Sequence, residues 1–255
     1  MLNYFNNSQY SKFKNTIVTC FVCNINNRKD RPVDKYIELG KVLLQTKIPK
    51  VIFMDEQIYD KFSDYFNEYN FFIKINQKDL YLNNYSDKIT CVDINTTFKD
   101  KDTLNYFYNM GNKTEFIKRA TLLNIFNTPN FIWIDFGIKH MFNCDNNEFI
   151  KIIENLNNKV YDNQLRISSI WNLQQKYVFD IYKDITWYFA GSVFGGSKEK
   201  LLEFADKTKD MYLRVIEEKK TLMWEVNIWY LVYLENPDLF TPYYCGHDPS
   251  IIIHF

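Results

Sequence analysis

Residues 131–140 read Phe-Ile-Trp-Ile-Asp-Phe-Gly-Ile-Lys-His, an apolar run that ends in an aspartate and a glycine. Continuous apolar runs of this length are typical of strands covered on both faces. Similar runs occur at 16–23, 51–54 and 89–92. Helical patterns are found at 32–46, 113–126, 146–157, 197–218 and 222–234. Strands that alternate with helices predict an α/β fold with a mainly parallel central sheet flanked by helices.

Composition places the chain among globular proteins. Of its 255 residues, 46% are hydrophobic and 24% are charged, which excludes a disordered or fibrous chain. We expect a single domain over residues 16–255, preceded by a loose N-terminal arm at 1–15. Thirty-one basic residues balance 31 acidic ones, so the chain lacks the basic excess typical of nucleic-acid binding.

The sequence also predicts where the protein works. No apolar run approaches the 18 residues of a membrane span, and the polar N-terminus does not resemble a signal peptide. The five cysteines are an odd number, as expected for free intracellular thiols. The Cys-x-x-Cys spacing of Cys20 and Cys23 is one that zinc sites use. Because positions i and i+3 of a strand face opposite sides, buried thiols are favoured over a zinc site. We therefore expect a cytoplasmic protein with no membrane span.

Glycine is scarce and unevenly placed. The chain has seven glycines, and five of them fall in three short segments, 133–137, 191–196 and 246–247. Glycine permits positive φ and close approach of the backbone to a ligand. Ordinary turns would explain any one segment, whereas all three together favour a binding site. Residues 191–197 are expected to form a glycine-rich turn that enters a helix capped by Ser197.

Asp135 is the first candidate site residue. In open parallel sheets ligands bind outside the carboxyl ends of the strands, which is where this carboxylate is expected. It could hold a divalent cation through oxygen ligation. Asp55 and Asp93 also follow apolar runs, but we interpret them as turn residues. His140, five residues after Asp135, is equally consistent with an ordinary surface position.

Glu225 is the second candidate. Residues 222–234 contain only two polar side chains, Glu225 and Asn227. A helix that is apolar all round is buried, and a buried carboxylate needs a partner or a raised pKa. Either Glu225 acts in a functional site, or it is satisfied by a neighbouring Lys, Arg or Tyr. His247 and Asp248 near the C-terminus form a further pair that suits Mn²⁺ or a similar ion.

With these segments in view, the chain resembles the WlaTC/HtrL family of proposed glycosyltransferases. The matching stretches are TIVTCFVC (16–23), FIWIDFGIKH (131–140), AGSVFGG (190–196), WEVNIW (224–229) and YCGH (244–247). The resemblance implies a GT-A-like fold that takes a sugar from a nucleoside diphosphate, expected to be UDP. A glycan, lipid-linked or protein acceptor would receive the sugar.

The resemblance also implies roles for single residues. Donor binding falls to Thr19, Phe21, Lys118, Asp135, Gly137, Gly191, Gly195 and Gly196, with Arg119 as a substitute for Lys118. Enzymes of this type usually carry Asp-x-Asp, but here the segment is Asp135-Phe-Gly137. A Mn²⁺ or Mg²⁺ ion would therefore need Asp135 together with His247. Glu225 is the expected general base, or it orients donor hydroxyls if the reaction retains configuration.

Two other functions stay open at this stage. One is a non-catalytic relative that binds a nucleotide or a sugar, suggested by the incomplete Asp-x-Asp. The other is a nucleotidyltransferase, which normally has a glycine-rich basic loop after the first strand. Residues 24–28 contain no glycine, which argues against it.

Overall fold

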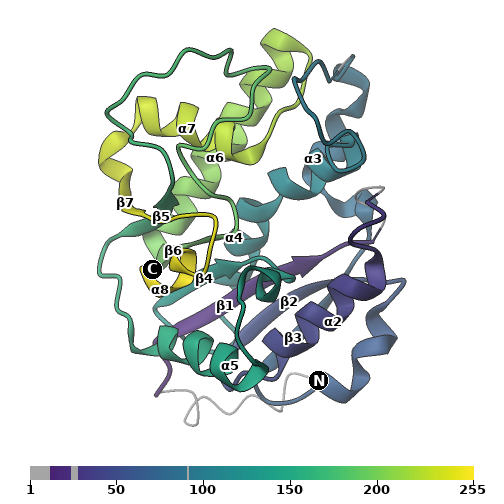
Figure 1. The fold of residues 1–255 in the computed structure, drawn as a ribbon, viewed down its shortest axis with the longest axis vertical. Coiled ribbons are helices and arrows are strands. Elements are labelled where there is room, and N and C mark those ends of the chain that lie inside the picture. Colours follow the sequence, from purple (N-terminus) through teal and green to yellow (C-terminus); the bar gives the residue numbers. More distant parts are fainter. Residues whose placement is uncertain (1–11, 24–27, 91) are drawn as a thin grey trace.

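The computed structural model describes residues 12–23, 28–90 and 92–255. Its centre is a seven-stranded sheet with the order β3-β2-β1-β4-β6-β5-β7 (Figure 1). The strands are β1 (Asn15–Phe21), β2 (Lys50–Asp55), β3 (Asn70–Ile75), β4 (Asn130–Ile134), β5 (Leu165–Ser169), β6 (Val193–Ser197) and β7 (Phe240–Tyr244). All neighbouring strands are parallel except that β6 runs antiparallel to β4 and β5. The expected α/β class with a mainly parallel sheet is confirmed.

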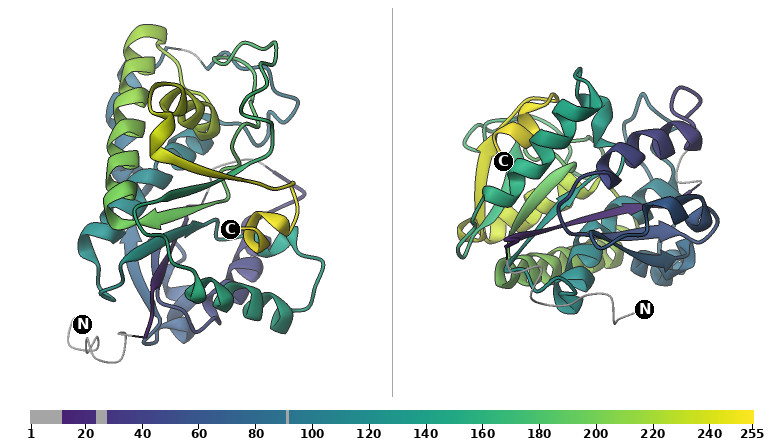
Figure 2. Two further views of the ribbon diagram at one scale, coloured as in Figure 1. Left: turned by 90° about the vertical axis from the view of Figure 1, so that its left-hand side faces the viewer. Right: turned by 90° about the horizontal axis from the view of Figure 1, so that it is seen from below.

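Helices cover both faces of the sheet, as the view from below shows (Figure 2). They are α2 (Val33–Leu44), α3 (Leu104–Gly111), α4 (Lys113–Leu123), α5 (Asn146–Glu154), α6 (Lys198–Lys219), α7 (Glu225–Glu235) and α8 (Ser250–Ile253). Shorter 3-10 turns include η2 (Tyr59–Tyr65), η4 (Tyr81–Lys88) and η5 (Ile138–Met141).

Successive side chains of β1 point to opposite faces of the sheet, so they pack into two different parts of the core. Val18 and Cys20 pack into the cluster that includes α4, α6 and α7, whereas Ile17 packs with α2, α5 and α8. Phe21 points to the same side as Ile17 and packs with α2 and η2. Every residue of β1 is buried, so the strand has no face exposed to solvent, although Asn15, Thr16 and Thr19 are polar.

The antiparallel strand β6 brings a new segment to the carboxyl edge of the sheet. Ile134 at the end of β4 pairs with Val193 at the start of β6. The backbone N–H of Asp135 donates to the carbonyl of Ser192 at 3.0 Å. Residues 191–192 therefore lie beside Asp135 although they are far from it in sequence.

Most of the predicted elements are present with shifted ends. The runs at 16–23, 51–54 and 131–134 are confirmed as β1, β2 and β4, and all five helical patterns contain helices. The predicted strand at 89–92 is wrong for the residues that the structure describes there, since η4 ends at Lys88 and the chain then runs on without strand pairing. Cys91 lies outside the described residues.

The predicted glycine-rich turn at 191–197 is wrong in its extent: residues 191–192 form a turn but 193–197 form β6, whereas the predicted capping of the next helix by Ser197 is confirmed. Gly195 and Gly196 lie inside β6, away from the carboxyl edge, where neighbouring strands come very close. A Cβ on Gly195 would lie 2.6 Å from the carbonyl oxygen of Phe131, and one on Gly196 would lie 2.0 Å from that of Gln164. None of the glycines has a positive φ. These two are needed for strand packing, and the structure does not bring them to Asp135.

Helix α7 begins at Glu225, three residues later than the pattern predicts. Its carboxylate therefore lies in the first turn, where the helix dipole favours negative charge. Asn227, the other polar residue, accepts from the backbone and hydroxyl of Thr186 and donates to the carbonyls of Ile181 and Asp184. Asn227 thus fixes the 181–186 segment on the helix.

The folded part of the chain starts before residue 16. Phe13 is buried against Tyr69, and Asn15 is already part of β1. Most of the expected N-terminal arm, residues 1–11, lies outside the described residues. Among the helices of the described part, none combines the length and the apolarity that a bilayer crossing requires.

Candidate functional site

The site is centred on the side chain of Lys113, the first residue of α4. Its Nζ lies 2.9 Å from Oε1 of Glu225 and 3.0 Å from Oδ1 of Asp135. It also donates to the carbonyl of Gly191 at 3.0 Å. Three elements of distant sequence thus meet at one ammonium group at the carboxyl edge of the sheet. We call Lys113, Asp135 and Glu225 the charged cluster.

The members of the charged cluster differ in exposure. The side chains of Lys113 and Glu225 are 3% and 6% exposed, whereas that of Asp135 is 33% exposed. Asp135 also accepts a hydrogen bond at 2.8 Å from the indole of Trp133, on the strand that delivers it. Asp135 is therefore the member of the cluster that a ligand can reach.

The charges of the cluster do not cancel. Burial disfavours the ammonium form of Lys113, but Asp135 and then Glu225 outweigh it, so the pKa of Lys113 is raised. The lysine is a cation at neutral pH, and all three of its N–H groups have acceptors. With both carboxylates ionised, the charged cluster carries a net charge of −1.

Glycine at position 191 makes this arrangement possible. A Cβ there would lie 2.2 Å from Oε1 of Glu225 and 3.2 Å from Nζ of Lys113. Any other residue would push the carboxylate away from the lysine. Of the glycines predicted to bind the donor, Gly191 is the one that contacts the charged cluster.

Two cations lie over tyrosine rings just before α3 and just before α2, and Lys101 also forms an ion pair with Asp102 at 3.4 Å. Nζ of Lys101, just before α3, lies 5.0 Å from the ring centre of Tyr106. The guanidinium of Arg31, just before α2, lies 5.8 Å from that of Tyr36. Burial raises the pKa of Tyr106, and the negative charges of Glu225, Asp102 and Asp135 raise it further.

The predicted metal pair, Asp135 and His247, stays a prediction. His247 is exposed, and its ring packs edge-on against Trp187 at 4.3 Å. It follows β7, which is three strands from β4 in the sheet. In the part of the chain that the structure describes, no three His, Cys, Asp or Glu residues are grouped to hold a metal ion.

The other predicted donor residues lie near the site or away from it. Thr19 is fully buried in β1, and its hydroxyl has no hydrogen-bond partner in the described structure. Phe21 stacks on Phe136 at 5.2 Å and lies under the loop that follows Asp135. Gly137 continues that loop, and a Cβ there would lie 2.9 Å from the ring of Tyr36.

Lys118 is not brought to the charged cluster. It is partly exposed on α4 and forms an ion pair with Asp206 of α6. Its substitute Arg119 lies over the ring of Phe53, 5.0 Å from its centre. The basic residue that contacts Asp135 is instead Lys113.

Asp55 has the turn role expected for it, since its carboxylate accepts from the backbone N–H groups of Cys23 and Gln57 at 2.8 and 2.9 Å. Asp93 forms an ion pair with Lys183 at 2.5 Å. Neither carboxylate belongs to the charged cluster.

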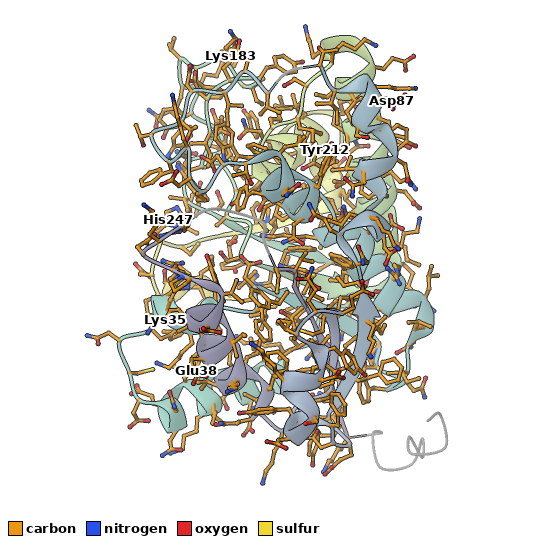
Figure 3. All side chains as sticks on the ribbon, turned by 90° about the vertical axis from the view of Figure 1, so that its right-hand side faces the viewer. Lys35, Glu38, Asp87, Lys183, Tyr212 and His247 are labelled. Carbon is orange, nitrogen blue, oxygen red and sulfur yellow. The ribbon has the colours of Figure 1, made fainter. Side chains whose placement is uncertain are left out.

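A groove of about 540 Å³ lies beside the site between α2 and η5. His140, Leu39 and Lys139 are among its lining residues, together with Lys35 and Glu38 of α2. The Nδ1 atom of His140 lies 2.7 Å from the carbonyl of Gly137, next to Asp135. Figure 3 shows Lys35 and Glu38 on the same side of the molecule as His247. The volume is within the usual range for small-molecule sites.

Sequence reasoning missed Lys113, which contacts both Asp135 and Glu225. A signal for Lys113 was present, because the buried Glu225 required a partner and Lys was one of the types named for it. Nothing in the sequence singled out this lysine from the others.

A family model described as "Bacterial protein of unknown function (HtrL_YibB)" matches residues 14–247. The chain belongs to this family. The resemblance drawn from the five sequence stretches is thus confirmed at the level of the HtrL_YibB family. No curated protein matches the chain significantly.

Among solved structures, the chain is similar to 4-diphosphocytidyl-2C-methyl-D-erythritol synthase from Anaerococcus prevotii DSM 20548. The two are 9% identical with a TM-score of 0.44, over 98% of this chain and 97% of that one. Similarity at this level carries no functional argument.

Proposed function

We propose that this HtrL_YibB family protein is a glycosyltransferase with a GT-A-like donor site. It would move a sugar from a nucleoside diphosphate, expected to be UDP, to a hydroxyl group of a glycan, lipid-linked or protein acceptor. The observation that carries the proposal is the charged cluster, which presents the partly exposed Asp135 at the carboxyl edge of an α/β sheet. The sequence motifs shared with the WlaTC/HtrL family supply the substrate class.

The energetics of the cluster favour a functional role. Removing charged groups from water costs more than a buried ion pair usually returns, so an apolar core at this position would stabilise the fold as well or better. Two carboxylates around one lysine leave a net negative charge, which makes the arrangement still less favourable for stability alone. Buried ionisable side chains with charged partners occur at functional sites more often than elsewhere.

Within the proposed reaction, the two carboxylates have different tasks. The bond between the sugar and the diphosphate breaks, the acceptor oxygen bonds to the sugar carbon, and the hydroxyl proton must pass to a base. Asp135 is exposed enough to contact the donor or the acceptor. Glu225 is enclosed by Lys113 and Gly191, so we assign it to positioning Lys113. This differs from the general-base role expected for Glu225 from the sequence.

A turnover screen tests the proposal. Wild-type protein would be incubated with common UDP- and GDP-sugars, with EDTA or with Mn²⁺, and release of the nucleoside diphosphate would be measured. We expect at least one donor to be turned over. Asp135→Asn should lower kcat roughly 10²–10⁴-fold, the usual range for loss of an acid–base group.

The positioning role of Glu225 has a separate readout in the same assay. Glu225→Gln keeps an acceptor for Lys113 and should lower kcat far less than Asp135→Asn does. Nucleotide binding without turnover of any donor would instead favour the non-catalytic binding relative. Turnover unchanged in folded Asp135→Asn would exclude the assigned site.

A further inference from the structure

The groove between α2 and η5 is joined to the charged cluster by the chain that follows Asp135. The backbone N–H of Ile138 donates to the carbonyl of Asp135 at 3.0 Å, and that of His140 donates to the carbonyl of Gly137 at 3.2 Å. His140 lines the groove. At the rise of a 3-10 turn, the five residues from Asp135 to His140 span about 10 Å. The groove is therefore a cavity close to Asp135 that could receive a second substrate.

Part of the groove lining is apolar. Val42 of α2 and Phe142 are buried there, and Leu39 and Tyr65 are half-buried. Small-molecule sites combine apolar side chains of this kind with a few polar groups that fix the orientation of the ligand. The lining thus suits a small organic molecule better than a bare ion.

The rest of the lining carries an excess of positive charge. Lys41 pairs with Glu38 at 2.9 Å, so these two charges offset each other. Lys139 donates to two backbone carbonyls at 3.3 and 2.7 Å, which leaves one of its three N–H groups for a ligand. Lys35 is exposed, and neither Lys35 nor Lys139 forms an ion pair with a carboxylate of the described residues.

This excess favours an anionic ligand. The chain as a whole has a net charge of zero, so two lysines without carboxylate partners make the groove more positive than the average surface. Ammonium groups bind carboxylate and phosphate oxygens through charge-assisted hydrogen bonds.

The ring of His140 has a defined hydrogen-bonding arrangement at the groove. Its Nδ1 lies 2.7 Å from the carbonyl oxygen of Gly137. Because a carbonyl oxygen only accepts, Nδ1 carries the hydrogen and donates it. Burial lowers the pKa of His140 from its ordinary 6.5, so the ring is neutral at neutral pH and Nε2 has a lone pair. His140 can therefore accept a hydrogen bond from a hydroxyl group in the groove.

We propose that the groove binds the acceptor, and that this acceptor is a sugar bearing a carboxylate or a phosphate group. Lys35 and Lys139 bind the anionic group, and Nε2 of His140 accepts a hydrogen bond from a sugar hydroxyl. The inference rests on the proposed function, because it names the class of molecule that receives the sugar.

Titrations followed by two-dimensional ¹H–¹⁵N NMR test the inference with glucuronic acid, glucose 6-phosphate and glucose. At least one of the two anionic sugars should bind about tenfold more tightly than glucose and shift the backbone signals of Lys139 and His140. The tighter of the two identifies the group as a carboxylate or a phosphate. Acetate and inorganic phosphate lack the sugar ring, so each should bind at least about threefold more weakly than the corresponding sugar.

Two variants that remove charge locate the anionic group. Lys139→Gln can still donate to the two carbonyls, so the affinity for the anionic sugar should fall about tenfold while that for glucose is unchanged. Lys35→Gln should lower the affinity for the anionic sugar about threefold, because the charge of an exposed lysine is screened by solvent. Lys35→Gln keeps the test decisive if Lys139→Gln destabilises its turn.

The hydroxyl contact has a different signature. His140→Phe keeps an aromatic ring without Nε2, so it should weaken binding of glucose and of the anionic sugar alike, by about threefold or more. Lys159→Gln is the matched control, since Lys159 is exposed and its backbone carbonyl accepts from Asn15 at the amino edge of the sheet. It should leave all affinities within about twofold of the wild type.

The same sugars in the donor screen separate the two proposals. The preferred anionic sugar should raise nucleotide release at least about tenfold above the rate with water alone, because it is bound beside the donor. Anionic sugars that bind no more tightly than glucose, or an unaltered affinity in the Lys35→Gln, Lys139→Gln double variant, would overturn the inference and leave glycosyl transfer intact. An anionic sugar that binds without raising nucleotide release would also overturn it. No turnover of any donor would remove both glycosyl transfer and the assignment of the groove to its acceptor.

Discussion

Replacing Lys113 with methionine removes the cation that contacts both Asp135 and Glu225. Breaking a buried ion pair by deleting one partner costs about 3–5 kcal/mol, because the other charge is left buried. The Glu225 side chain is 6% exposed, so its unpaired charge would carry the full desolvation cost. The Asp135 side chain is 33% exposed, so water would offset part of the cost of its unpaired charge. We therefore expect a loss of about 3 kcal/mol, which corresponds to a fall in Tm of roughly 6–12 °C for a domain of this size.

Urea unfolding of four proteins measures the effect and its origin. The set is wild type, Lys113→Met, Glu225→Gln and the double variant. Because the two residues are in contact, the double variant should lose at least about 1 kcal/mol less than the sum of the single losses. Lys159→Met is the control for loss of an exposed lysine. A cost below about 1 kcal/mol for Lys113→Met, or strict additivity in the cycle, would refute the buried charged cluster.

Three further results are expected. Burial lowers the pKa of Lys50 from its ordinary 10.5 to about 7, so the folded protein binds fewer protons than the unfolded chain between these values. The free energy of unfolding of the wild type relative to that of Lys50→Met should then rise from pH 7 to 9 by up to about 1.4 kcal/mol per pH unit. Below pH 7 the difference should be constant. Urea unfolding that shows the opposite slope would contradict this expectation. Gly191→Ala should lower stability by about 1–3 kcal/mol and UDP affinity at least tenfold in melting and calorimetric measurements, because the added Cβ displaces Glu225; an unchanged Kd would count against the site. Lys118→Gln should change stability by less than about 0.5 kcal/mol and leave the Kd for UDP unaltered, since Lys118 pairs with Asp206 at the surface; a tenfold loss would restore the phosphate-binding role inferred from the sequence.

The sequence predicted the strands and helices that can be recognised from a short stretch of residues alone. The apolar runs of β1, β2 and β4 and the periodicity of the helices needed no knowledge of neighbours. β6 was missed because Gly195 and Gly196 carry no strand signal and pack only against strands that are remote in sequence. β7 contains Pro242, which is tolerated because β7 is an edge strand, a position that the sequence does not reveal.

The same distinction applies to the site. Asp135 was found because it ends an apolar strand, and Glu225 because it interrupts an apolar helix. Lys113 was missed because a lysine at the start of a helix is usually exposed, and only the packing of α4 beside Gly191 and α7 buries it. The pairing of Asp135 with His247 was expected because both lie beside glycines and the segment after Asp135 lacks a second carboxylate, and it stays a prediction.

A crystal structure of the protein with UDP tests the central claim most directly. The account places the nucleotide at the carboxyl edge of the sheet, with the site of the missing sugar beside Asp135. Lys113 should still bridge Asp135 and Glu225 in that complex. UDP bound elsewhere, or a complex in which Lys113 no longer contacts Asp135 and Glu225, would contradict the account.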